Sequence, residues 1–557
     1  MKITRLLLAC GLAALAAQGQ AQMVTGAKIP GFDETMGTSS AAPADYTATC
    51  IESSAPGNIL WPGEQAEVTI QIVNNTAAPL KATGQLDIVH YATRGRPGDI
   101  WKPDMYRLAV EAGDPVHLDV APHGWTNLKL RPTLPEIKGA YALVLDLGPQ
   151  GRRFVTSLVR TFRAERKPEQ YPQLCMDIED PDVLTRLGVA PNRIGIPYRP
   201  TTDPDFERWY TKATARLREY SKAHLSVTVE IGGGNTQADQ PLGRPRPHLD
   251  DNGFMKDTKF DLAWLPSYDA DFKLFVKRLV SEFGWPRGPV NSIKLFNEPW
   301  EGLSISGWGA DMIRYREIFT AMAEATEEAR RDARVEVLIG GCDSEDNTFD
   351  KLFGDGKDTF LPWLDFVSVH YAGMFPPSTI KAWLDRKSPR GRVRIWDTES
   401  WVANCDDRVA AVVAANLSTG HDRAVGVYGG NVVSAEHPNV FDASGKSQRG
   451  YTLTAWPVAA AVGAVTHFIG ERKFKELLFK GGLPWVMVFD GQVGPDGKAA
   501  VEDGTVVVVG DLGEEFGPDN VLFRTARGMK EVQRKEELRH KLAALPDDDG
   551  QRGGLEG

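Results

Sequence analysis

The sequence predicts an α/β protein built on a (β/α)8 TIM barrel, with an antiparallel β-sandwich before the barrel and a small β-domain after it. Three changes of pattern predict this order: hydrophobic residues alternate with a period of two over residues 46–167, strand-like runs alternate with helical stretches over 168–470, and alternation returns over 471–530. The chain has 557 residues, 42% of them hydrophobic and 25% charged. This composition is typical of folded, water-soluble domains, and the length predicts two or three of them.

The first 22 residues have the layout of a cleavable secretory signal. Lys2 and Arg5 precede an apolar run at 6–17, and small residues follow as far as Ala21. A lipoprotein signal ending at Cys10 is the alternative, but the apolar run continues past this cysteine. Residues 23–45 are rich in Gly, Ser, Ala and Pro, which predicts a flexible linker. We therefore expect a secreted or periplasmic protein.

The first folded domain is predicted over residues 46–167. Runs at 68–72, 116–120 and 141–145 alternate hydrophobic and polar residues, and turn-forming clusters at 74–76 and 148–151 separate such runs. Short alternating strands joined by tight turns are typical of an antiparallel β-sandwich.

The pattern changes near residue 168 to strands that alternate with amphipathic helices, which predicts βα units and a parallel sheet. Two long helical stretches are expected at 206–223 and 312–331. Eight units in about 260 residues match the size of a complete barrel. The candidate strands are residues 173–178, 193–198, 225–231, 292–296, 335–340, 366–370, 393–396 and 424–428.

Alternation at 483–489 and 505–509 predicts the small C-terminal β-domain, and residues 531–557 form a charged tail. No stretch after the signal is long and apolar enough to span a bilayer. The formal net charge is −10 and the basic residues are dispersed, so nothing indicates binding to nucleic acid or to an anionic membrane.

The four cysteines beyond the signal do not predict a metal site. Cys50, Cys175, Cys342 and Cys405 are scattered, without CxxC spacing or a neighbouring histidine pattern. They are either buried thiols or include one disulfide. We expect neither a metal nor an organic cofactor.

Two glutamates stand at the ends of predicted strands, where barrel enzymes carry their catalytic groups. The fourth strand ends in Asn297-Glu298-Pro299, and the seventh strand leads to Glu399. Cleavage of a glycosidic bond needs one carboxyl group to protonate the leaving oxygen and a second to attack or to activate water. Glu298 and Glu399 are the candidates for these two roles.

These residues resemble clan A of the retaining glycoside hydrolases, whose barrels carry an Asn-Glu-Pro acid/base motif after strand four and a nucleophile at the end of strand seven. The resemblance covers roughly residues 170–470 and is nearest to family 39-like β-glycosidases. It implies that Glu298 is the general acid/base, that Glu399 is the nucleophile and that Asn297 binds the sugar 2-hydroxyl. It also implies carboxyl groups about 5 Å apart.

Further candidates for substrate binding are two residues implied by the same resemblance and three tryptophans near the glutamates. His370 and Tyr371 end strand six, where the clan has a His or Tyr that orients the nucleophile or contacts the sugar. Trp300, Trp308 and Trp401 follow the two glutamates, and an aromatic face can pack on a pyranose ring. Trp300 is the best binding candidate of the three because it lies closest to the predicted acid, whereas the other two are expected to be packing residues.

Several polar residues are left with two interpretations. The clan has an arginine near the end of strand two, and both Arg193 and Arg199 qualify. Asp177 and Glu230, at the predicted ends of strands one and three, either contact substrate or cap helices.

The predicted function is hydrolysis of a β-linked glycoside or polysaccharide by double displacement through a covalent glycosyl-enzyme. A transglycosylase would use the same residues, and a non-catalytic extracellular carbohydrate-binding protein is the alternative from another class. The flanking β-domains either bind carbohydrate or brace the barrel. A further alternative is an extracellular scaffold, in which the β-sandwich binds the ligand and the barrel is a spacer.

Overall fold

The computed structural model describes residues 45–96, 99–111, 113, 115–164, 170–232, 242–245, 260–299, 308–344, 362–370, 390–399, 406, 409–418, 420–426, 432–470, 472–478, 485–490 and 504–509. The described residues form two compact units. The first lies within Met1–Thr161, Asn404–Asp407 and Val432–Ala460, and the second within Phe162–Ala403, Arg408–Asn431 and Ala461–Gly557. The predicted signal peptide, the linker up to residue 44 and the charged tail are outside the described residues.

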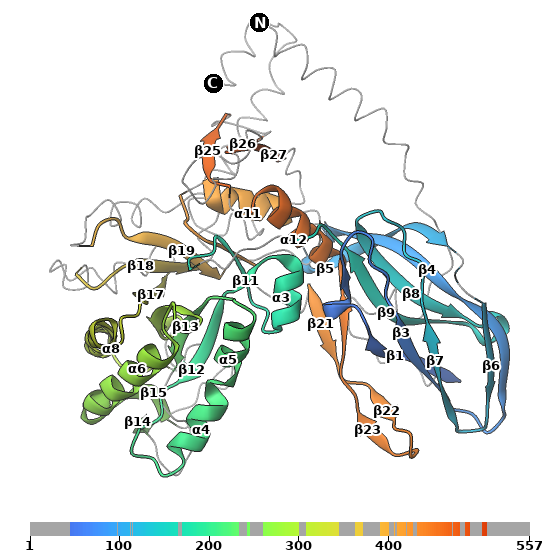
Figure 1. Cartoon of the computed structure of the whole chain (residues 1–557), viewed down its shortest axis with the longest axis horizontal. Helices are drawn as coiled ribbons and strands as arrows, with labels where there is room; N and C mark the ends of the chain where they lie inside the picture. Colours follow the sequence, from blue (N-terminus) through green and yellow to red (C-terminus); the bar gives the residue numbers. More distant parts are fainter. Residues whose placement is uncertain are drawn as a thin grey trace, which may run out of the picture. The chain divides into compact units, whose positions relative to one another are not determined.

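The first unit contains two larger β-sheets (Figure 1). One sheet has three antiparallel strands in the order β1-β3-β7, which are β1 (Tyr46–Ser53), β3 (Val68–Asn74) and β7 (Trp125–Leu130). The other has the order β2-β9-β8-β4-β5 with β6 also paired to β4, and its strands are β2 (Ile59–Leu60), β4 (Leu80–Arg96), β5 (Asp99–Glu111), β6 (Pro115–Val120), β8 (Gly139–Asp146) and β9 (Arg152–Arg160). Buried side chains from both sheets form one hydrophobic core.

The three alternating runs predicted in this region are the strands β3, β6 and β8. In β6 the side chains of Val116, Leu118 and Val120 are buried, whereas the residues between them are exposed. Successive side chains of a strand point to opposite faces, so every second residue of β6 faces the core.

A late segment of the chain also belongs to the first unit, although the sequence pattern assigned it to the stretch 168–470. It forms two antiparallel strand pairs, β21 (Val433–Glu436) with β24 (Thr452–Ala455) and β22 (Asn439–Phe441) with β23 (Ser447–Arg449). The buried Gln71 side chain donates to the Phe441 carbonyl at 2.9 Å and accepts from the Phe441 N–H at 2.7 Å. A buried amide needs such partners, and only the folded chain brings these two residues together.

The second unit contains a strand at each of the eight positions predicted for the barrel. They are β10 (Leu174–Met176), β12 (Arg193–Pro197), β13 (Val227–Gly232), β16 (Val290–Leu295), β17 (Leu338–Ser344), β18 (Phe366–His370), β19 (Arg394–Glu399) and β20 (Ala424–Gly426). Six form one parallel sheet in the order β12-β13-β16-β17-β18-β19. In a second parallel sheet, β10 lies between β20 and the short strand β11 (Ala190–Pro191). Every residue of β16 and β18 is buried, as expected for parallel strands covered on both faces.

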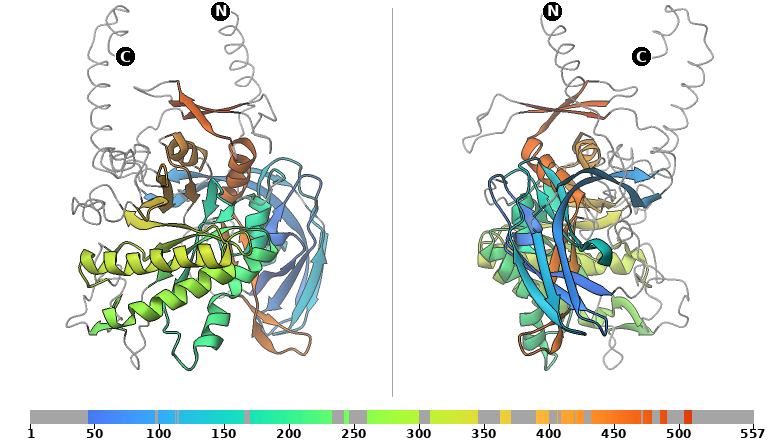
Figure 2. Two further views of the ribbon diagram at one scale, coloured as in Figure 1. Left: turned by 60° about the vertical axis from the view of Figure 1, so that its left-hand side comes forward. Right: turned by 90° about the vertical axis from the view of Figure 1, so that its right-hand side faces the viewer.

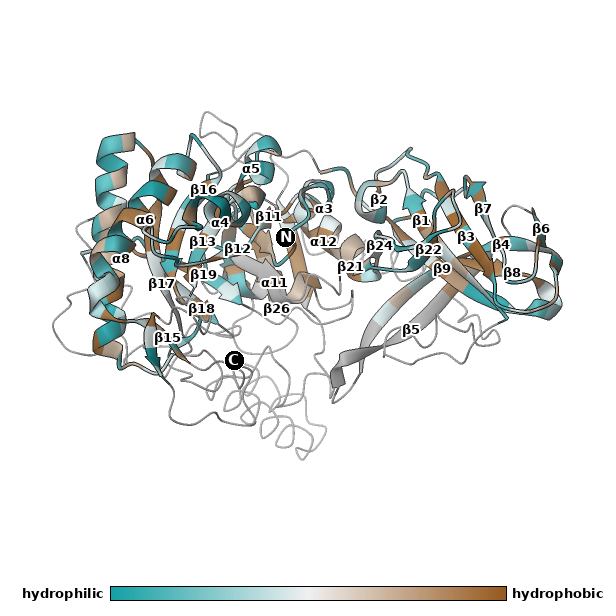
Figure 3. Cartoon of the chain, turned by 90° about the horizontal axis from the view of Figure 1, so that it is seen from below, coloured by the Kyte–Doolittle hydropathy of each residue, from teal (hydrophilic) through white to brown (hydrophobic). Residues whose placement is uncertain are grey.

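Helices alternate with these strands, which makes this unit a mixed α/β structure. The α-helices among the described residues are α3 (Pro181–Leu187), α4 (Phe206–Ala213), α5 (Ala215–Lys222), α6 (Asp269–Phe283), α8 (Met312–Ala333), α11 (Val409–Ser418) and α12 (Pro457–Phe468). Helices α6 and α8 lie side by side (Figure 2). Each carries a hydrophobic and a hydrophilic face (Figure 3), and α6 buries Phe272, Phe275, Val276 and Leu279 at helical spacing.

The helix expected over 206–223 is interrupted at Thr214. Its hydroxyl donates to the Tyr210 carbonyl at 2.7 Å, and its backbone leaves the helical region at φ −95° and ψ 3°. A threonine side chain that bonds to the preceding turn competes with the helical backbone pattern, which accounts for the division into α4 and α5.

Smaller elements complete the second unit. The strands β14 (Gly243–Pro245) and β15 (Phe260–Trp264) form an antiparallel pair, and β25 (Phe474–Leu477), β26 (Trp485–Phe489) and β27 (Thr505–Val509) form an antiparallel sheet. Cys50 and Cys175 are buried thiols. Within the described ranges, no helix is both long enough and apolar enough to cross a bilayer.

Candidate active site

The candidate catalytic residues lie where neighbouring parallel strands end. Asn297 and Glu298 follow β16, and His370 and Glu399 are the last residues of β18 and β19. The carboxyl ends of parallel strands share one edge of a sheet, where α/β proteins bind their ligands. A register shift between Val369 and His370 places His370 directly opposite Glu399. Such irregularities re-aim side chains beside active sites.

A tight turn after β16 directs Glu298. Phe296 has a φ of 55° and Glu298 a φ of 44°, both in the left-handed region that non-glycine residues rarely adopt. The strain of each residue is about 1 kcal/mol or more, so the surrounding structure must hold the turn. The Phe296 N–H donates to the Ile231 carbonyl at 2.9 Å, and the Phe296 ring packs edge-on against Trp308.

His370 joins the two glutamates. Its Nδ1 lies 2.6 Å from Glu298 Oε1 and 3.5 Å from Glu399 Oε2, and its Nε2 lies 3.1 Å from the Thr398 hydroxyl. One oxygen of each glutamate and a ring nitrogen of His370 all lie within 4.8 Å of one another. The histidine is fully buried, whereas both carboxyl groups are partly exposed. The predicted acid and the predicted nucleophile therefore face the same small space.

Arg193 completes the group. Its Nη2 donates to Glu399 Oε2 at 2.7 Å, and its Nη1 donates to Asn297 Oδ1 at 2.7 Å. Arg199, the other candidate, pairs instead with Asp203 at 2.8 Å. The structure therefore separates two arginines that sequence spacing left equivalent.

Other polar residues around the site had no assigned role. Glu230 of β13 pairs with Lys294 of β16 at 2.7 Å and with Arg193 at 3.3 Å. Asp177, after β10, accepts a hydrogen bond from Asn192 Nδ2 at 2.7 Å, and burial raises the pKa of its carboxyl group. In the sequence, these residues share one feature: each is a charged residue within or directly after a predicted strand. A charged side chain is costly to bury without a partner, so its presence there indicates a partner nearby.

The candidate aromatic contacts divide into two groups. Tyr371, Trp300 and Trp401 lie outside the described residues. Trp308 is 1% exposed and packs between Phe296 and Tyr315, so it is a packing residue with no face open to a sugar.

Glu298, His370 and Glu399 form the one group, within the described residues, whose ligand atoms are close enough to hold a metal ion. Two carboxylates and an imidazole are suitable ligands for a divalent cation. However, the guanidinium of Arg193 already contacts Glu399, and a second cation beside it would be repelled. We therefore assign no metal site to these residues.

Asp397, two residues before Glu399, is a buried carboxyl group with consequences for stability. Burial is the main cause that raises its pKa to about 8, with Glu399 and Asp177 adding to the effect. Its oxygens accept from the Asn416 side chain at 2.6 Å and from the Glu399 N–H at 3.1 Å. The folded protein therefore holds a proton on Asp397 at pH values where the unfolded chain has lost it.

This raised pKa predicts how stability depends on pH. Since the folded state binds more protons, Asp397 stabilises the protein below about pH 4, and this contribution is lost as the pH rises through about 8. Asp397→Asn should remove this dependence. The melting temperature of the variant minus that of wild type should therefore be about 3 °C greater at pH 8 than at pH 5. The exposed Asp119→Asn serves as the control in thermal melts, and parallel pH curves for all three proteins would contradict the prediction.

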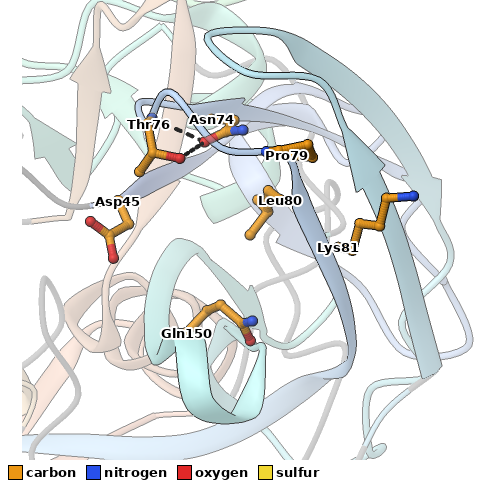
Figure 4. Close-up of a pocket in the computed structure, with 7 residues that line it drawn as sticks. All are labelled: Asp45, Asn74, Thr76, Pro79, Leu80, Lys81 and Gln150. Carbon is orange, nitrogen blue, oxygen red and sulfur yellow. Dashed lines mark hydrogen bonds between the residues drawn. The ribbon is translucent and has the colours of Figure 1, made fainter.

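A separate pocket lies in the first unit (Figure 4). Its volume is about 400 Å³, and it is lined by Asp45, Asn74, Thr76, Pro79, Leu80, Lys81 and Gln150. The Thr76 hydroxyl donates to Asn74 Oδ1 at 2.8 Å, and Lys81 pairs with Asp119. None of the lining residues is aromatic, so the pocket lacks a stacking surface for a sugar ring.

Comparisons with known proteins give weak similarities. No protein-family model and no curated protein sequence matches the chain. Among solved structures, it is similar to a glycoside hydrolase family 30 subfamily 8 xylanase from Clostridium acetobutylicum, with 11% identity, a TM-score of 0.36 and coverage of 56% of this chain and 73% of the other. It is similar to β-glucuronidase 2 of Bacteroides uniformis, with 10% identity, a TM-score of 0.28 and coverage of 84% and 58%. A conserved exported protein from Bacteroides fragilis matches with 14% identity, a TM-score of 0.33 and coverage of 51% and 65%. Glycoside hydrolases are thus among the solved structures to which this chain is similar.

Proposed function

We propose that this protein is a secreted, retaining glycoside hydrolase that cleaves β-linked glycosides or polysaccharide on a closed (β/α)8 barrel. The observation that supports this most is the distance between the two glutamates, whose nearest oxygens lie within 4.8 Å of each other. Retaining enzymes hold their two carboxyl groups about 5–5.5 Å apart, whereas inverting enzymes separate them by about 6.5–9.5 Å to admit a water molecule.

Closure of the barrel is supported by contacts between its first and last strands. β10 pairs with β20, and an isolated parallel bridge joins Trp396 of β19 to Arg423, just before β20. The buried Arg423 also donates to the Thr228 hydroxyl of β13 at 2.9 Å. One side chain thus connects the eighth and third strands, as expected where side chains fill the interior of a barrel.

In the proposed mechanism Glu399 attacks the anomeric carbon while Glu298 protonates the leaving oxygen. The ion pair with Arg193 directs Glu399 Oε2 and favours the carboxylate form that a nucleophile requires. Water then hydrolyses the glycosyl-Glu399 ester, and Glu298 acts as the base. Because each of the two steps inverts the anomeric carbon, the product keeps its β configuration.

Asn297 is the proposed contact of the sugar 2-hydroxyl. Its Oδ1 accepts from Arg193, which has no acceptor atoms, and this fixes the orientation of the amide. The Nδ2 group is then the one left to donate to substrate.

Product stereochemistry tests this proposal. Wild-type protein is incubated with a panel of nitrophenyl β-glycosides and plant or bacterial polysaccharides, and the first hemiacetal formed is followed by proton NMR. Initial release of the β-anomer is the expected result. Initial release of the α-anomer would exclude double displacement, and binding without turnover would favour a carbohydrate-binding protein. Transfer of the glycosyl group to added sugar acceptors would identify a transglycosylase.

His370 supplies a further prediction. Without the contact between its Nδ1 and Glu298, the acid loses its hydrogen-bond partner and its fixed position. We expect His370→Gln to lower kcat by about 10²-fold. His421→Gln is the control, because His421 is also buried in this unit but bonds to the Asn416 carbonyl. An equal loss of kcat in both variants would mean that His370 contributes only to folding.

A further inference from the structure

A buried ion pair lies beside the candidate catalytic residues. Lys294 has no exposed side-chain surface, and its ammonium group is 2.7 Å from Glu230 Oε2. Lys294 belongs to the strand that leads to Asn297 and Glu298, and Glu230 belongs to the neighbouring strand. Taking two charges out of water costs several kcal/mol per ion, and well-packed hydrophobic residues often stabilise a protein equally well. Stability alone is therefore a poor explanation for this pair.

The pair is connected to the nucleophile through Arg193. The same Glu230 oxygen that contacts Lys294 lies 3.3 Å from Arg193 Nη1. Arg193 then donates to Glu399 and to Asn297. Four charged groups of alternating sign thus form a chain from Lys294 through Glu230 and Arg193 to Glu399.

We propose that Glu230 and Lys294 are positioning residues: Glu230 holds the Arg193 guanidinium where it reaches both Glu399 and Asn297, and Lys294 balances the charge of Glu230. The role in catalysis rests on the proposed function, whereas the electrostatic coupling to Glu399 does not. If Glu230 were unbalanced, its negative charge would offset that of Arg193 and leave Glu399 less stabilised as a carboxylate. Lys294 therefore allows Glu230 to orient the arginine without cancelling it.

Other charged groups lie on the strands around Glu399. They are Asp177 after β10, Arg193 on β12, Glu230 on β13, Lys294 on β16, Glu298 after β16, His370 on β18, Asp397 on β19 itself and Arg423 before β20. All of them except the substituted residue are common to the two single variants, which remove charges of opposite sign.

The sign of each effect follows from electrostatics. Glu230→Gln removes a negative charge near Glu399, and its amide oxygen can still accept from Arg193, so it makes the ionisation of Glu399 easier. Lys294→Met removes a positive charge and makes that ionisation harder. In the double variant Glu230→Gln/Lys294→Met both charges are gone, so the ionisation of Glu399 should return close to that of wild type. A purely structural pair would weaken folding in the single variants without moving the ionisation of Glu399 in opposite directions.

The experiment measures the ionisation of Glu399 without any substrate. Intact wild-type and variant proteins are treated at pH 5 with a water-soluble carbodiimide and glycine ethyl ester, which modify protonated carboxyl groups, and the rate at Glu399 is read by fragment-ion mass spectrometry. We expect modification to be about tenfold faster in Lys294→Met and about tenfold slower in Glu230→Gln than in wild type, equal to a shift of about one pH unit each way.

Matched controls come from a partly exposed ion pair of the same type. Lys273 and Glu324 lie 2.8 Å apart on α6 and α8. Lys273→Met and Glu324→Gln should leave the rate at Glu399 unchanged. Changes of equal sign in the two buried-pair variants, or no change in either, would overturn the proposal. If Lys294→Met does not fold, the slower modification in Glu230→Gln and its reversal in the double variant decide the question.

Failure of this inference is distinguishable from failure of the proposed function. Modification of Glu399 needs no turnover, so the opposite shifts can be observed even in a protein that cleaves no glycoside. If the protein is active, the acid limb of its profile of kcat/KM against pH should move by about one unit to lower pH in Glu230→Gln and to higher pH in Lys294→Met. If both variants still hydrolyse the substrate and the acid limbs of their pH profiles do not move, only the positioning role of Glu230 and Lys294 is rejected.

Discussion

Glu399→Gln is expected to lower kcat by about 10⁴-fold or more, because a neutral amide cannot form the covalent glycosyl-enzyme. Gln has nearly the same shape as Glu and can still accept from Arg193 Nη2, so folding and substrate binding should change little. The loss is measured with the best substrate from the stereochemical assay. The control Glu324→Gln, at a partly exposed position on a helix of the same unit, should retain wild-type activity.

A smaller side chain makes the test more specific. Glu399→Ala opens a space beside the Arg193 cation, and azide is an anion small enough to enter it. Azide that attacks from this side should restore turnover and yield the α-glycosyl azide from a β-glycoside. A β-glycosyl azide, or undiminished activity in Glu399→Gln, would remove Glu399 from the nucleophile's role.

Glu298→Ala should produce a loss that depends on the leaving group. Substrates with poor leaving groups need a proton on the departing oxygen, and for these we expect kcat/KM to fall by about 10³-fold. Dinitrophenyl glycosides leave without that proton, so their first step should be nearly unaffected. The second step still lacks its base, so a rapid burst followed by slow turnover is expected in stopped-flow absorbance.

Azide again distinguishes the roles. In Glu298→Ala it would replace water in the second step and yield the β-glycosyl azide, the opposite anomer to that expected from Glu399→Ala. A uniform loss for all leaving groups would contradict the role of Glu298 as general acid. In that case the shared contact with His370 would make general damage to the site the better explanation.

The sequence by itself predicted the local elements well. Alternation of hydrophobic and polar residues identified β3, β6 and β8. The change to strand-like runs separated by helical stretches identified strands and helices of the α/β unit. These patterns arise because each strand or helix must bury at least one of its faces, and residues at neighbouring positions of the chain meet that requirement. Asn297, Glu298 and Glu399 became candidates because they lie within three residues of the ends of predicted strands.

Only the tertiary structure decided which distant residues meet. Spacing could not separate Arg193 from Arg199, because the choice depends on which guanidinium reaches Glu399 from another strand. Gln71 likewise draws the segment around Phe441 into the first unit through hydrogen bonds that span most of the chain. The hydrophobic periodicity of the sequence indicates which side chains are buried. It does not indicate the partners of buried charges and amides, because the positions of those partners depend on the complete fold.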